Sequence, residues 1–131
     1  MREILFRAKH THSNEFVYGY GFYSNRDKCY KIDNGDGILY FCKKETIGEY
    51  SGQKDKYGTR IFEGDIVKLY LSVEETCYVE FCDGQFVLQS TDKEMLCGSA
   101  FLMRLSESLT SKIEVIGNIY DNRDLLEVDN G

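Results

Sequence analysis

The sequence of 131 residues predicts a mainly β protein. Its apolar residues come in short alternating runs, and the segments between these runs are rich in Gly, Asn and Asp. Proline is absent, so glycine, Asn and Asp must supply the turns. With 42% hydrophobic and 14% aromatic residues, the chain has enough apolar side chains to form a core. We therefore expect one compact unit in which strands far exceed helix.

The first part of the chain predicts strands joined by polar turns. The expected strands are residues 4–6, 16–23, 29–32 and 38–42. The last two form a hairpin around a turn cluster of Asp, Asn and Gly. Gly19 and Gly21 leave one face of their strand bare, which suits the close approach of another backbone or a bend. Residues 48–60, rich in Gly, Lys and Asp, are expected to form a loop.

The second part predicts a meander, an ambiguous segment and a last strand. The meander strands are residues 66–71, 77–81 and 85–89. Asp83-Gly84 is a good hairpin signal, because both residues accept positive φ. Residues 94–109 have leucines at helical spacing but also a glycine and serines, so we expect one short helix or turn. Residues 112–116 predict the last strand, and Asp121 can cap a short helix at 122–126.

Charge is unevenly divided along the chain. The formal net charge is -6, with +2 on residues 1–64 (11 basic, 9 acidic) and -8 on residues 65–131 (5 basic, 13 acidic). Nucleic-acid affinity comes largely from contacts between cations and phosphates. The negative second half therefore argues against nucleic acid as a partner.

Five cysteines without a C-x-x-C pair predict reduced thiols that act as small hydrophobic residues, and no zinc site. No apolar run approaches the roughly 18 residues of a membrane span. The charged start of the chain also interrupts any secretory signal. We expect a soluble cytoplasmic protein with no cofactor and no membrane contact.

The sequence contains no clear catalytic constellation. His10 and His12 would lie on one face of a strand, and Glu15 could complete a metal site, but a solvated turn is the favoured interpretation. A nucleophile elbow of the G-x-S-x-G type does not occur, and no phosphate-binding loop occurs either. We do not expect an enzyme.

One basic run stands out between residues 43 and 60. Lys54, Lys56 and Arg60 belong to it, with Tyr57 interleaved. Cations beside aromatic rings are how single-stranded nucleic acid is bound, although nearby acidic residues dilute this pattern. An ordinary solvated loop is the favoured interpretation, and these four residues are our candidate interaction residues.

Four motifs, in order along the chain, carry a resemblance to a family. They are Met1-Arg-Glu-Ile with Phe6-Arg-Ala8, then Val17-Tyr-Gly19, then residues 52–58 leading into Ile61-Phe-Glu-Gly-Asp-Ile-Val67, and finally Val115-Ile-Gly-Asn-Ile-Tyr-x-Asn122 with Leu125-Leu126. In this combination the chain resembles the YopX family of phage and prophage proteins. The resemblance implies a bacterial host cell as the location.

The resemblance also implies a fold and an assembly. A β-rich part at residues 1–60 would be followed by an SH3-like β-barrel at residues 61–131 with a short C-terminal helix, and ring-like homo-oligomers would form. It supplies no catalytic residues.

The family motifs themselves are best explained as structure. Gly64 can adopt a left-handed turn and Asp65 can accept backbone N–H groups, although Glu63 with Asp65 could instead bind a divalent ion. Gly117-Asn118 predicts a bulge or closing turn, with a contact site as the alternative.

Two classes of function remain open. The first is a phage accessory protein, a homo-oligomeric scaffold or protein-interaction module that captures a host or phage protein; many tyrosines and phenylalanines favour it. The second is a small nucleic-acid-binding β-barrel, or an acidic DNA mimic that inhibits a DNA-binding protein.

Overall fold

The structure, a computed structural model, describes residues 5–90, 102–105 and 107–126. The chain divides into two compact units, residues 1–50 and 51–131. The sequence places this boundary at residues 60 and 61 instead. The difference arises because residues 51–60 contain a strand end and a turn whose hydrogen bonds are made to the second unit, as shown below.

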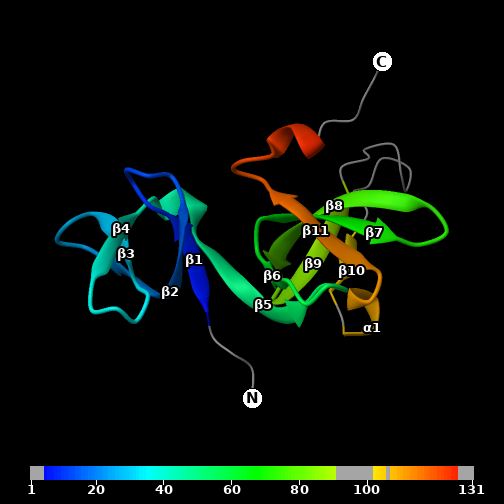
Figure 1. Ribbon diagram of the computed structural model, residues 1–131, viewed down its shortest axis with the longest axis horizontal. Helices are drawn as coiled ribbons and strands as arrows, with labels where there is room; N and C mark the ends of the chain where they lie inside the picture. The colour runs from blue at the N-terminus through cyan, green and yellow to red at the C-terminus, as the bar shows by residue number, and fades with distance from the viewer. Residues whose placement is uncertain (1–4, 91–101, 106, 127–131) are drawn as a thin grey trace. The chain divides into compact units, whose positions relative to one another are not determined.

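The first unit holds the larger part of a six-stranded sheet with the order β4-β3-β2-β1-β5-β6. The neighbouring pairs from β4 to β5 are antiparallel, and β6 belongs to the second unit. Strand β5 continues into the second unit (Figure 1). The elements are β1 (Phe6–Lys9), β2 (Phe16–Ser24), β3 (Cys29–Asp33), β4 (Leu39–Cys42), the 3-10 helix η1 (Lys44–Thr46) and β5 (Gly48–Lys54). The predicted hairpin of the third and fourth strands is confirmed.

The sheet of the first unit closes on itself at one end. His10 and Cys42 form an antiparallel bridge between the ends of β1 and β4. Two backbone hydrogen bonds support it, from Thr11 N–H to the Phe41 carbonyl (3.0 Å) and from Lys43 N–H to the Lys9 carbonyl (2.8 Å). The enclosed side is filled by a small apolar cluster, which consists of Ala8, Tyr30, Ile32 and Cys42.

Gly19 and Gly21 allow two neighbours to approach β2 closely. A Cβ at Gly19 would lie 2.1 Å from the Asp33 carbonyl oxygen, and a Cβ at Gly21 would lie 2.2 Å from the Tyr30 hydroxyl. Real side-chain atoms cannot approach that closely. The predicted bare face of this strand is therefore confirmed, and both its occupants come from β3.

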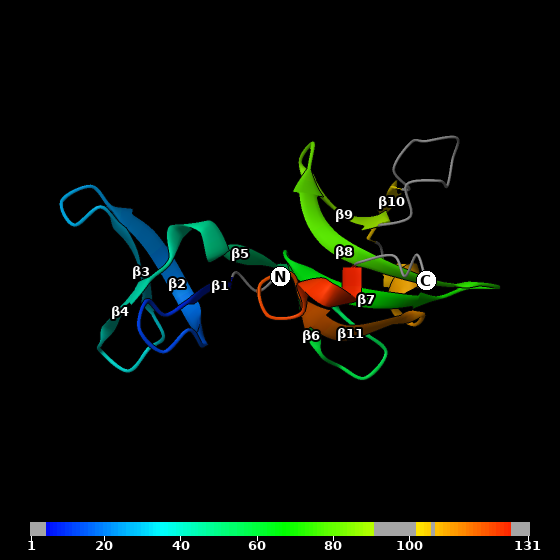
Figure 2. The ribbon, with the colours of Figure 1, turned by 90° about the horizontal axis from the view of Figure 1, so that it is seen from above.

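The second unit contains a five-stranded antiparallel sheet with the order β10-β9-β8-β7-β11. Its elements, after β5, are β6 (Arg60–Phe62), β7 (Asp65–Tyr70), β8 (Glu74–Cys82), β9 (Gln85–Ser90), β10 (Leu102–Arg104), α1 (Glu107–Thr110), β11 (Ile113–Asn118) and the 3-10 helix η3 (Arg123–Leu126). Figure 2 shows that β8 and β9 curve along their length, so the sheet curls into a half-barrel. This is the region predicted to be an SH3-like barrel.

Side chains that point to the same side of the sheet at alternate positions of its strands form the core of this half-barrel. Successive residues of β7 and β8 point to opposite sides of the sheet, and the cross-strand partners Val67 and Cys77 both point into the core. The fully buried core residues include Ile61, Val67, Leu69, Cys77, Val79, Leu88 and Ile113. The predicted meander, last strand and short C-terminal helix are confirmed, and with them the mainly β fold class.

One prediction about local structure is wrong, and a second is confirmed in part. The expected loop at residues 48–60 is largely strand, because Gly48 pairs with Arg7 of β1 and Tyr50 N–H bonds to the Leu5 carbonyl (2.8 Å). In the ambiguous segment 94–109 the expected short helix is α1, which begins at Glu107, but Leu102–Arg104 forms a strand paired with β9 that was not expected. Residues 94–101 and 106 lie outside the described residues. At β5 and β10, pairing with other strands outweighed local composition.

Among the described residues, the longest helices have four residues, and none is long and apolar enough to cross a membrane.

The close approach at Gly19 leads to a stability prediction. Gly19→Ala should lower the free energy of unfolding by about 1–3 kcal/mol, because the new Cβ forces β2 away from the Asp33 backbone. Gly35→Ala is the control. It has a φ of 95° but nothing within 4 Å of its Cβ, so only backbone strain opposes it. Thermal denaturation should rank Gly19→Ala as the more damaging change, and the reverse order would contradict the packing.

Candidate functional site

The turn between β5 and β6 is organised by one carboxylate. Asp55 Oδ1 accepts hydrogen bonds from the N–H groups of Tyr57 and Thr59, both at 2.9 Å. Asp55 N–H donates in turn to the Thr59 carbonyl (2.8 Å). An Asp side chain that binds the backbone two residues later is a well-known way to fix a turn. The backbone of residues 55–59 is therefore fixed by its own first residue.

The second oxygen of the same carboxylate ties this turn to β11. Asp55 Oδ2 accepts the N–H of Val115 (2.9 Å), and Lys56 N–H donates to the Ile113 carbonyl (3.0 Å). β11 is the last strand in the order of the five-stranded sheet. The turn therefore supplies hydrogen bonds that a further strand would otherwise provide, and Asp55 is only 7% exposed.

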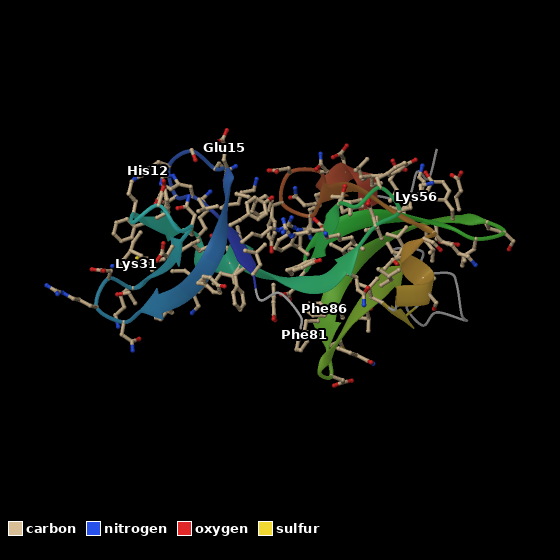
Figure 3. All side chains as sticks on the ribbon, turned by 60° about the horizontal axis from the view of Figure 1, so that its bottom comes forward. His12, Glu15, Lys31, Lys56, Phe81 and Phe86 are labelled. Atoms are coloured by element: carbon tan, nitrogen blue, oxygen red, sulfur yellow. The ribbon has the colours of Figure 1, made fainter. Side chains whose placement is uncertain are left out.

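The predicted interaction residues lie on and beside this turn. Lys54 ends β5 and Arg60 begins β6, and both are exposed. Lys56 Nζ lies 4.1 Å from the ring centroid of Tyr70 and 5.1 Å from that of Tyr57 (Lys56 is labelled in Figure 3). Tyr57 is 69% exposed. The structure therefore brings Lys56 and Tyr57 together.

Two residues that complete this site were not found from the sequence. The Tyr70 hydroxyl donates a hydrogen bond to Glu114 Oε1 (2.7 Å). This bond and the desolvation of the ring raise the pKa of Tyr70 to about 12, so the hydroxyl stays protonated. Tyr70 and Glu114 are far apart in sequence, and the β7–β11 pairing brings them together. In the sequence, the only sign of this hydrogen bond was the predicted strand at residues 112–116, which contains Glu114.

Gly64 and Asp65 form the turn that starts β7. Gly64 has a φ of 92°, a left-handed conformation that favours glycine. Its N–H donates to the Val79 carbonyl and its carbonyl accepts from Ile119 N–H, both at 2.8 Å. Asp65 is buried, and its Oδ2 accepts the Phe62 N–H (2.8 Å). These contacts give the pair a structural role at the centre of the second unit.

Gly117 and Asn118 form a bulge and a turn at the end of β11. The register against β7 shifts between Val115 and Gly117. Asn118 Oδ1 accepts the N–H groups of Tyr120 (3.0 Å) and Asp121 (2.9 Å), while Asn118 N–H donates to Asn122 Oδ1 (3.1 Å). A Cβ at position 117 would lie 2.5 Å from that same Asn122 oxygen. A larger residue at position 117 would have to displace the Asn122 side chain that closes the turn.

The two histidines lie in the turn between β1 and β2. His10 Nδ1 accepts the backbone N–H groups of His12 (3.3 Å) and Ser13 (3.2 Å), so this nitrogen is engaged within the turn. Within residues 5–90, 102–105 and 107–126, no group of three His, Cys, Asp or Glu side chains could hold a metal ion.

Four described cysteines are free thiols: Cys29, Cys42, Cys77 and Cys82. Burial raises the pKa of Cys77 to about 12 and that of Cys42 to about 11. A thiol is a nucleophile only as the thiolate. Cys42 and Cys77 therefore act as small apolar residues of the two cores, whereas Cys97 lies outside the described residues.

Residues 5–127 match the family described as YopX protein. The chain belongs to the YopX family. The Asp55 turn, the Gly64-Asp65 turn and the Gly117-Asn118 bulge all lie within the matched residues, and each has a structural task in this YopX protein.

A solved structure has the same fold. The crystal structure of protein EF1440 from Enterococcus faecalis is similar to this YopX chain, with a TM-score of 0.62 and 23% sequence identity. The similarity covers 97% of this chain and 100% of that chain. No curated protein matches the sequence.

The role of Asp55 can be tested by an isosteric change. Asp55→Asn should cost about 1–3 kcal/mol of stability, because an amide cannot accept all three N–H groups and its own NH₂ must face one of them. Asp83→Asn is the matched control, since Asp83 is an exposed hairpin residue with a φ of 52°, which Asn also tolerates. Urea denaturation should separate the two variants; equal midpoints would show that the Asp55 bonds contribute nothing.

Proposed function

We propose that this YopX-family chain is a phage- or prophage-encoded accessory protein of the bacterial cytoplasm that works by binding rather than by catalysis. In this proposal it is a homo-oligomeric scaffold or protein-interaction module, and the β5–β6 turn is one of its contact surfaces. Family membership supports the proposal, and the geometry of the turn carries it.

The observation that carries the proposal is an exposed tyrosine on a fixed backbone. Tyr57 is 69% exposed, and its N–H is bound by the buried Asp55 carboxylate. Lys56 next to it is positioned over Tyr70. Tyrosine is enriched at the centres of protein interfaces. A partner that binds Tyr57 has little backbone entropy left to remove, which favours affinity.

The buried titratable groups support a role without catalysis. The Asp55 and Asp65 carboxylates both accept backbone N–H groups, which is a structural use of a buried charge. The buried thiols Cys42 and Cys77 have raised pKa values, the opposite of an activated nucleophile. These groups stabilise the two units and need no substrate to explain them.

Light scattering after gel filtration tests the proposal. The wild-type chain should form a defined homo-oligomer at micromolar concentration, and Tyr57→Ala should shift it towards smaller species by removing a central contact. A clean wild-type monomer would remove the scaffold proposal in this form.

Tyr20→Ala is the matched control for this experiment. Tyr20 lies in the other unit and is 68% exposed, almost as much as Tyr57. Loss of an exposed ring should leave the fold intact in either variant. We expect Tyr20→Ala to leave the oligomer unchanged, so an equal effect of both variants would assign assembly to general surface hydrophobicity instead of the β5–β6 turn.

A further inference from the structure

The β5–β6 turn carries cations without carboxylate partners. Lys54, Lys56 and Arg60 are exposed along it, beside the exposed ring of Tyr57. Among the residues that the structure describes, no carboxylate forms an ion pair with Lys54 or Lys56. The carboxylate of the turn itself, that of Asp55, is 7% exposed and accepts three backbone N–H groups. The turn therefore presents positive charge and an aromatic ring to solvent.

The opposite combination occurs at the tip of the β8–β9 hairpin. Phe81 is 48% exposed, and Asp83 is exposed in the turn of the hairpin. Glu80 is half-buried on β8. The charge of Asp83, the desolvation of the thiol and the charge of Glu80 raise the pKa of Cys82, so both carboxylates lie close to this residue. We call Glu80, Phe81 and Asp83 the acidic tip.

The acidic tip has no cation of its own. Within residues 5–90, 102–105 and 107–126, neither Glu80 nor Asp83 forms an ion pair. Phe81 packs edge to face against Phe86, with 5.0 Å between the ring centroids. Phe86 belongs to the core of the second unit, so a buried ring supports the exposed one. The tip is thus a positioned aromatic side chain beside uncompensated negative charge.

The turn and the acidic tip lie at opposite ends of β8. Lys56 contacts the ring of Tyr70, whose cross-strand partner is Glu74, the first residue of β8. Asp83 directly follows the last residue of this strand. The nine residues of β8 span roughly 25 Å along the strand. Figure 3 shows the same separation between Lys56 and Phe81. The two surfaces therefore cannot neutralise each other within one chain.

We propose that the acidic tip of one copy of this chain binds the β5–β6 turn of a second copy. In this contact the carboxylates of the tip face the ammonium groups of the turn, and Phe81 lies against Tyr57. Opposite charges steer such a contact and fix its register, while buried aromatic rings supply much of the binding free energy. The inference rests on the proposed function and names the surface that the turn binds.

Each copy offers one surface of each kind. The contact is therefore head-to-tail, and it repeats from one copy to the next. A nucleic-acid strand fits the turn less well, because its phosphates extend beyond the turn over a unit with 8 basic and 15 acidic residues (-7 for residues 51–131). A hairpin tip places its carboxylates at the turn alone, and screening limits the repulsion between more distant charges.

Charge reversal with complementation tests this contact on the full chain. The turn variant is Lys54→Glu/Lys56→Gln, in which glutamine avoids a second carboxylate near Glu114. The tip variant is Glu80→Lys/Asp83→Asn, in which asparagine tolerates the φ of 52°. In light scattering over a concentration series, each variant alone should self-associate roughly 10- to 100-fold more weakly than the wild type, because like charges face each other.

Mixing the two variants should restore association. The acidic turn of one variant then meets the basic tip of the other, and the unchanged tip and turn fit as in the wild type. Restoration also shows that both variants are folded, which circular dichroism of each checks separately. Wild-type association should weaken between about 0.05 M and about 0.5 M salt, because salt screens attraction between exposed charges.

Arg26→Glu is the control for net charge. Arg26 is an exposed cation of the first unit, in the turn between β2 and β3. Its reversal makes the chain more negative, as the turn variant does, without touching either surface. We expect Arg26→Glu to self-associate like the wild type.

Four results contradict the inference. They are wild-type association by either variant alone, a mixture that associates no better than its components, an equal loss in Arg26→Glu, and labelled oligo-dT that binds the wild type more tightly than a second copy does and fails to bind the turn variant. The last result would make nucleic acid the occupant of the turn.

The same measurement separates this inference from the proposed function. A wild-type monomer would remove the scaffold and the contact together. A wild-type oligomer that is unchanged in both variants would remove this contact alone and leave the scaffold standing.

Discussion

The Asp55 carboxylate joins the β5–β6 turn of the second unit to the last strand of its sheet. Its two oxygens accept three backbone N–H groups, two within the turn and one from Val115 of β11. A buried carboxylate is costly unless it is bound in this way, and once bound it fixes both partners. The turn, the last strand of the order and the exposed Tyr57 are therefore positioned together.

This arrangement separates stability from binding in the molecule. The family motifs at Asp55, at Gly64-Asp65 and at Gly117-Asn118 all bind backbone groups or allow close approach, so they maintain the fold. Exposed rings lie elsewhere, on the β5–β6 turn and on the acidic tip of the β8–β9 hairpin. A fixed scaffold with variable exposed side chains can serve different partners without a change of fold.

Much of the fold could be predicted from the sequence, because alternation and turn residues are local signals. The hairpins at Asp33–Gly37 and Asp83-Gly84 are examples. Strand β5 was missed because its pairing with β1 joins residues about 40 positions apart, and its composition is that of a loop. The candidate residues Lys56 and Tyr57 were found, whereas Tyr70, Glu114 and the position of the acidic tip required the register between strands.

Hydrogen exchange of the Val115 amide tests the central claim most directly. Val115 lies on the last strand of the sheet order, and its N–H bonds to a side chain, Asp55 Oδ2, rather than to a neighbouring strand. If this carboxylate joins the turn to the sheet, the Val115 amide should exchange as slowly as core amides of β7 and β8. Exchange at the rate of an unprotected amide would contradict the account, because the turn would then be detached from β11.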